Sequence, residues 1–173
     1  RRANEITGGV PGGAYPCAPG GPNDYVYIYV QPMNAEMWRQ LVGALGRDDL
    51  LDDARFRDAK TRWEHRDALN AIVTEWTRTR TKHDVLAILG KAGVPCGAIQ
   101  DTAEVLDDPH LNARGAITTI DHPTRGRFRL PSCPVRLSAS PAQTTAPPLA
   151  GQHTSDILAE VLGLSADDVA TLR

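Results

Sequence analysis

The sequence has little of what marks a secreted, membrane-spanning or nucleic-acid-binding protein. It holds three cysteines, 5% aromatic residues and a formal net charge of −2. The cysteines are far apart and form no C-x-x-C pair, so neither a disulfide framework nor a clustered zinc site is expected. The longest apolar runs are far too short to cross a bilayer, and no basic tract indicates nucleic acid. We therefore expect reduced thiols, a cytoplasmic location, and no metal, membrane or nucleic-acid partner.

What the sequence does contain is enough apolar material for a core. Its hydrophobic fraction is 41% and its charged fraction 23%, values typical of a globular protein. A chain of 173 residues fits one domain, or one small domain with a piece of another. Because aromatic residues are sparse, aliphatic side chains must supply most of the packing.

Glycine and proline dominate residues 6–23. Glycine permits positive φ and proline lacks the backbone donor, so this composition predicts a loop without regular secondary structure. Tyrosine then alternates with valine and isoleucine over residues 25–30. This period of two predicts a strand with two different faces.

Helical periodicity follows in the middle of the chain. Asn34 is placed to cap a helix that ends near Gly46. The pattern predicts one longer helix over residues 58–79, whose charged face is expected to be solvated, and another that begins with a capping-box variant at Thr81. Residues 94–99 have the composition of a short buried strand.

The last part of the chain has strand and linker patterns. Strands are predicted at 117–120 and 127–130, and a Pro/Ser/Thr/Ala tract at 138–151 is typical of a linker. Two short helices capped by Thr154 and Ser165 complete the pattern. The predicted fold class is therefore α/β (α+β), with helices packed on a small, largely antiparallel sheet.

Residues 8–13, with the sequence GGVPGG, are the strongest candidate for a binding loop. Glycines let a backbone approach a ligand closely and present N–H groups to an oxyanion. No Lys-Ser/Thr follows as in a P-loop, and no helix follows as in a dinucleotide fingerprint. A flexible connector would have the same composition, so the local sequence leaves both interpretations open.

Other reactive residue types have no evident catalytic partner. Cys96 has no neighbouring base that would activate a nucleophile, so a structural thiol is expected. Trp63 lies among charged residues and is a candidate for covering an interface. The histidines have no catalytic or metal-ligating spacing, and surface or helix-capping positions explain them: His65, His83, His110, His122 and His153. Composition and spacing thus predict an α/β domain with a glycine loop, and no reaction.

Short segments spread over nearly the whole chain fit one known family. They are GGVPG (8–12), YPC (15–17), NDYVYI (23–28), GRDDL (46–50), DARF (53–56), AGVPCG (92–97), EVLDDPHL (104–111) and PPLAGQHT (147–154). Each segment is weak evidence alone, whereas their common order and spacing are specific. Together they resemble the C-terminal part of class III CoA-transferases of the formyl-CoA:oxalate kind.

The resemblance implies a particular domain organisation. In this family a large Rossmann-like domain is built from both chain ends, a small domain is inserted late, and two protomers interlock as a homodimer. By resemblance, residues 1–22 are a glycine-rich loop and connector, and residues 23–115 are the small domain. Residues 116–173 would be the crossing strands, the linker and the C-terminal helices of the large domain.

The resemblance also implies a reaction, in which CoA moves from an acyl-CoA such as formyl-CoA to a free carboxylic acid. An aspartate nucleophile forms a mixed anhydride and then an aspartyl-CoA thioester. That aspartate is expected in an N-terminal part of the enzyme, a partner that this sequence does not include. No catalytic residue is therefore assigned here, and these residues alone are expected to be inactive. The CoA thioester is a substrate, and no covalently bound cofactor is implied.

By match, Gly8, Gly9 and Val10 occupy the substrate-contacting positions of a glycine loop that shields the reactive intermediate from water. The formyl-CoA enzymes have a fuller glycine run that ends in glutamine, whereas Thr7 and Val10 interrupt it here. Valine cannot replace the hydrogen bonds of glutamine, so this departure counts against the oxalate specificity that the resemblance implies. Two alternatives stay open: an acyl-CoA racemase-like member of the same fold, and a non-catalytic interaction module that uses the helical face near Trp63.

Overall fold

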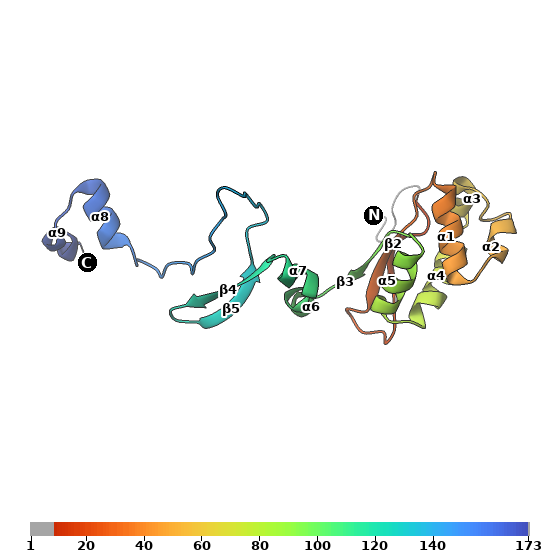
Figure 1. Ribbon diagram of the computed structural model, residues 1–173, viewed down its shortest axis with the longest axis horizontal. Helices are drawn as coiled ribbons and strands as arrows, with labels where there is room; N and C mark the ends of the chain where they lie inside the picture. The colour runs from red at the N-terminus through yellow and green to blue at the C-terminus, as the bar shows by residue number, and fades with distance from the viewer. Residues whose placement is uncertain (1–8, 173) are drawn as a thin grey trace. The chain divides into compact units, whose positions relative to one another are not determined.

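The computed structural model describes residues 9–172, and the chain divides into two compact units, Arg1–Asp101 (unit 1) and Thr102–Arg173 (unit 2) (Figure 1). Each unit is described by itself. The predicted borders after residues 22 and 115 concern the domains of a whole enzyme and stay predictions.

Unit 1 contains a three-stranded antiparallel sheet. In spatial order its strands are β1 (Gly12–Pro16), β2 (Tyr25–Tyr29) and β3 (Cys96–Ile99). The register pairs Tyr15 with Val26 and Ile28 with Cys96. Val26 and Ile28 are fully buried, while the tyrosines of β2 are half-buried. The predicted two-faced strand is confirmed.

Strand β1 lies in the segment 6–23, for which the prediction of no regular secondary structure was wrong. β1 is an edge strand, so its backbone pairs with a neighbour on one side only. Glycine at its start and Pro16 at its end are compatible with an edge position. Tyr15 anchors the strand, because its ring is buried and its hydroxyl donates to Oδ1 of Asn70 at 2.7 Å.

Helices cover the sheet of unit 1. They are α1 (Ala35–Leu45), α2 (Asp49–Asp52), α3 (Ala59–Glu64), α4 (Arg66–Arg78) and α5 (Lys82–Lys91). Helix α4 packs on β1, and α5 packs on β2 and β3. The predicted caps are confirmed: Asn34 accepts the N–H of Met37, Gly46 ends α1 at φ 68°, and Thr81 forms a capping box with Asp84.

The single helix predicted over residues 58–79 is in fact two helices, α3 and α4. His65 separates them with φ −105° and ψ 26°. The apolar repeat on which the helix prediction rested begins only at Leu69. It therefore predicts α4 and gives no information about the polar residues before it. A further short helix, α2, lies between α1 and α3.

The core of unit 1 is mostly aliphatic, as the sparse aromatic content predicted. Its largest fully buried side chains belong to both the sheet and the helices. They are Val26, Ile28, Val30, Leu41, Val42, Leu50, Phe56, Leu69, Val73, Val85 and Leu89.

Unit 2 contains short elements. They are α6 (Thr102–Asp107), α7 (Pro109–Ala113), the antiparallel hairpin of β4 (Ile117–His122) and β5 (Gly126–Pro131), α8 (Thr154–Leu162) and α9 (Ala166–Thr171). The predicted hairpin and terminal helices are confirmed, as is the cap at Ser165. Thr154 is the first residue of α8 and not its cap, and His153 before it makes no side-chain capping hydrogen bond.

Few side chains are buried in unit 2. Among the hydrophobic residues of its described part, Ile120 and Val169 are buried. Many large hydrophobic side chains are exposed instead: Phe128, Val135, Leu137, Leu149, Ile157, Val161, Leu162 and Leu172.

Candidate functional site

The glycine loop passes beside the end of β2. The N–H of Val30 donates to the carbonyl oxygen of Pro11 at 2.9 Å. A Cβ on Gly12 would lie 2.7 Å from the carbonyl oxygen of Gly9, and a Cβ on Gly9 would lie 3.2 Å from Cε2 of Tyr29. The backbone thus approaches itself so closely that any larger residue at position 12 would displace it.

Of the three residues predicted to contact substrate, the structure describes two. Gly8 lies outside the described residues. Gly9 is buried, and Val10 is 7% exposed and belongs to the hydrophobic core of unit 1. The side chain of Val10 is therefore engaged in packing, and only its backbone could meet a ligand. The predicted substrate contact stays a prediction.

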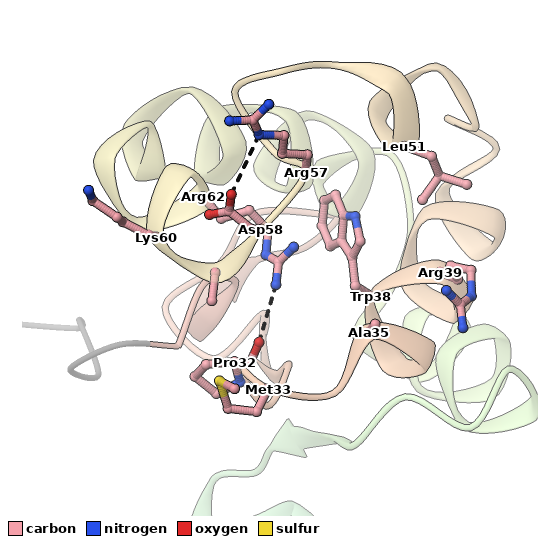
Figure 2. A pocket seen from close by; sticks show the side chains of 11 residues that line it. Pro32, Met33, Ala35, Trp38, Arg39, Leu51, Arg57, Asp58, Lys60 and Arg62 are labelled. Carbon is pink, nitrogen blue, oxygen red and sulfur yellow. Dashed lines mark hydrogen bonds and ion pairs between the residues drawn. The ribbon is translucent and has the colours of Figure 1, made fainter.

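A cavity of about 570 Å³ opens between α1, α2 and the start of α3 in unit 1 (Figure 2). Part of its wall is apolar, formed by Met33, Trp38 and Leu51 among others. Its charged lining residues come from α1 and from the segment that enters α3: Arg39, Arg57, Asp58, Lys60 and Arg62. The charged lining therefore comprises four cationic side chains and one carboxylate.

Arg62 is the most buried charge of this cavity, at 4% exposure. Its Nη1 donates to the carbonyl oxygen of Phe56 at 3.0 Å, and its Nη2 donates to that of Pro32 at 3.3 Å. The guanidinium carbon lies 4.9 Å from the ring centroid of Trp38, a cation–π contact. Burial lowers the pKa of Arg62, and the nearby charge of Asp58 raises it in part. Removal from water thus disfavours the positive charge, and the nearby carboxylate compensates it only in part.

The exposed charges around the cavity are weakly paired. Nε of Arg57 lies 3.5 Å from Oδ2 of Asp58, and Nζ of Lys60 lies 3.9 Å from Oε1 of Glu64. Such exposed pairs contribute little stability. The backbone N–H of Thr61 donates to Asp58 at 2.8 Å and holds the pKa of that carboxyl below its usual value. The cavity therefore suits binding of an anion more than bond-making.

The thiols and imidazoles of the described residues do not form a reactive site. Cys17 is buried and Cys96 half-buried, and burial raises the pKa of both thiols, which keeps them protonated and poorly nucleophilic. Cys133 is exposed. Within residues 9–172, no group of three or more His, Cys, Asp or Glu side chains could hold a metal ion.

Trp63, the suggested interface residue, is partly buried against the core of unit 1. The guanidinium carbon of Arg66 lies 5.3 Å from its ring centroid, so one face of the ring is already covered. The cavity itself was missed by sequence reasoning, because the cations that line it were assigned to solvated helix surfaces. The basic cluster RDAKTR at 57–62, directly at a helix start, is the signal that could have drawn attention to it.

Across residues 9–172, no helix combines the length and the apolar character that a membrane span requires.

The chain also matches known proteins. Residues 1–154 match the family model described as CoA-transferase family III. The small antiparallel sheets and packed helices of the chain superpose on a solved structure of CAIB/BAIF type. The fold class is therefore mixed α/β, as predicted. The chain belongs to CoA-transferase family III.

Curated relatives carry more specific names. The chain is 38% identical over 173 residues to a formyl-CoA:oxalate CoA-transferase of Streptomyces avermitilis, covering 100% of this chain and 42% of the relative. It is 34% identical over 175 residues to the enzyme of that name from Rhodopseudomonas palustris strain BisA53, covering 100% of this chain and 40% of the relative. The chain thus spans about two fifths of the length of these relatives.

Solved structures agree in fold. A CAIB/BAIF family protein from Brucella suis superposes with a TM-score of 0.72 at 31% identity, covering 91% of this chain and 39% of that chain. The protein Rv3272 from Mycobacterium tuberculosis gives a TM-score of 0.68 at 22% identity, covering 84% of this chain and 40% of that chain. The second likeness concerns the fold alone.

Proposed function

We propose that the chain is the C-terminal portion of a CoA-transferase that moves CoA between a formyl-CoA-like acyl-CoA and a free carboxylic acid. The observation that carries this proposal is the family match over residues 1–154, together with the naming of relatives that align with the whole chain. The complete enzyme would be a cytoplasmic homodimer, with acyl-CoA and a carboxylate as its substrates.

The covalent chemistry would belong to another part of that enzyme. An aspartate outside these residues would attack the thioester carbonyl, release the CoA thiolate and form a mixed anhydride. The thiolate would then attack the aspartyl carbonyl, give the aspartyl thioester and release the first acid. The acceptor carboxylate would repeat these two steps in reverse order. Burial raises the pKa of the buried Cys17 and of the half-buried Cys96, so these thiols are poor alternative nucleophiles.

The contribution of this chain would be the glycine loop that contains Gly8, Gly9 and Val10. Its support is geometric, because Val10 is packed in the core and Pro11 is hydrogen-bonded to Val30. These contacts fix one end of the loop on unit 1. A loop fixed in this way could exclude water from an intermediate held by the rest of the enzyme.

Mixing the chain with the remaining N-terminal part of the enzyme tests the proposal. With formyl-CoA as donor and oxalate or another dicarboxylate as acceptor, chromatography of the acyl-CoA products should show turnover in the mixture and none with either part alone. Turnover by the 173-residue chain alone would contradict the division of labour.

Two other outcomes would replace the proposal. Loss of the α-proton of a branched acyl-CoA to deuterated water, without transfer of CoA, would indicate a racemase-like enzyme. A stable complex of two well-folded parts that performs neither reaction would favour a non-catalytic interaction module.

A further inference from the structure

The cavity between α1 and α3 has no role in the CoA transfer proposed above, to which this chain would contribute its glycine loop. We propose that this cavity binds a phosphorylated organic ligand. The guanidinium of Arg62 would meet the phosphate from within, Arg57 and Lys60 would meet it from the rim, and the apolar wall would hold the organic body.

The cavity holds a buried positive charge. Arg62 is 4% exposed, and within residues 9–172 its hydrogen bonds go to two neutral carbonyl oxygens, with no ion pair to a carboxylate. Buried charges are normally paired, because removal from water is costly. An arginine has five N–H donors, so the two hydrogen bonds leave donors for an anion in the cavity that Arg62 lines.

The other cations of the cavity differ in how firmly they are paired. Arg57 and Lys60 are held by contacts of 3.5 and 3.9 Å, which are easily exchanged for a stronger partner. Arg39 is paired more closely, with Glu36 at 2.8 Å, and is less able to turn. The carboxylate of Asp58 opposes an anion, but the backbone N–H of Thr61 already engages it.

The apolar wall of the cavity favours a phosphate ester over a simple inorganic ion. The side chain of Met33 is 89% exposed beside the cavity, and Trp38 and Leu51 continue the apolar wall. A volume of about 570 Å³ lies within the range of small-molecule sites. The arginine and lysine donors that line this cavity match a phosphate dianion better than a single carboxylate does.

Calorimetric titration of the 173-residue chain tests the proposal with three probes: AMP, adenosine and inorganic phosphate. AMP joins a phosphate monoester to a flat, largely apolar body, and each of the other probes lacks one half. AMP should bind with a dissociation constant below about 1 mM, and at least about tenfold more tightly than either half. Binding should weaken as salt is raised, because exposed charges are screened.

The informative variant is Arg57→Gln combined with Lys60→Gln, since both side chains are exposed and leave the core untouched. It should weaken AMP binding by roughly tenfold, the loss of two charge-assisted contacts at an exposed rim. The matched control is Arg78→Gln, an exposed arginine on α4 outside the cavity, which should change the dissociation constant less than about twofold. Circular dichroism confirms that each variant is folded.

Four results would overturn the proposal. They are the absence of saturable AMP binding, equal affinity for AMP and adenosine, an unchanged affinity in the double variant, and binding of inorganic phosphate as tight as that of AMP. If inorganic phosphate binds as tightly as AMP, the apolar wall has no part in binding, which contradicts the proposal that the ligand has an organic body held there.

Discussion

Unit 1 and unit 2 differ in where their apolar side chains lie. In unit 1, Leu41 and Leu89 are fully buried, whereas in unit 2 Val161 and Leu162 are 72% and 64% exposed. Burial of apolar surface is the main favourable term in folding, so the side chains of unit 1 specify its structure by themselves. The apolar side chains that unit 2 itself leaves exposed on α8 are suited to contact with another surface. If the proposed function is correct, the rest of the enzyme covers them.

Truncation of one aliphatic side chain in each unit should give the largest difference between the two units, measured as a loss of unfolding free energy. Leu41→Ala removes a fully buried side chain of α1 and should lower the free energy of unfolding by about 2–5 kcal/mol. Val161→Ala, on α8, should change it by less than about 0.5 kcal/mol. Urea unfolding followed by circular dichroism measures both. Equal losses would mean that α8 packs in the same cooperative core as α1.

A second pair of variants tests the close backbone approach in the glycine loop. Gly12→Ala places a Cβ 2.7 Å from the oxygen of Gly9 and should lower the free energy of unfolding by roughly 1–3 kcal/mol. Gly43→Ala is the matched control inside α1, where a Cβ meets nothing within 4 Å. It should raise stability by about 0.5–1 kcal/mol, because alanine favours the helix. An unchanged stability for Gly12→Ala would show that the loop can relax.

Two capping boxes of the same type, one in each unit, allow a matched test with a smaller expected loss of stability. Thr81 accepts the N–H of Asp84 at the start of α5, and Ser165 accepts that of Asp168 at the start of α9. Thr81→Ala should lower the free energy of unfolding of unit 1 by about 1 kcal/mol. Ser165→Ala should leave the same transition unchanged, because α9 packs on α8 in unit 2. A shared shift would show that both units unfold together.

The smallest effect should appear as a pH dependence. Burial raises the pKa of Tyr15 above its ordinary value near 10.0. The folded state therefore keeps this proton where the unfolded chain loses it, so the contribution of Tyr15 to stability is complete below pH about 10 and falls as the pH rises further. The stability difference between the wild type and Tyr15→Phe, measured from pH 8 to pH 10.5, should narrow only above about pH 10. Parallel curves would place the hydroxyl of Tyr15 in solvent.

Sequence patterns predicted most elements of the fold because their determinants are local. Caps such as Asn34 and Gly46 act within one turn, and the alternation in β2 is visible over a few residues. Strand β1 was missed because its pairing with β2, and not its own propensity, makes it a strand. The break at His65 was missed because polar residues before Leu69 carry no periodicity.

The candidate sites could be predicted only in part. The glycine loop is contiguous in sequence and was found, although the burial of Val10 was not foreseen. The cavity depends on α1 meeting the segment before α3, and no local pattern contains that contact. Its central feature, Arg62 stacked on Trp38, joins residues far apart along the chain.

Hydrogen exchange, followed by mass spectrometry on the 173-residue chain with and without the remaining part of the enzyme, tests the central claim most directly. Alone, amides of β2, α4 and α5 should be strongly protected and those of α8 weakly protected. After the second part is added, α8 should gain protection of at least about tenfold, while α4 stays unchanged. If α8 is as protected as α4 in the chain alone, or gains nothing in a complex that forms, unit 2 is not completed by the rest of a CoA-transferase.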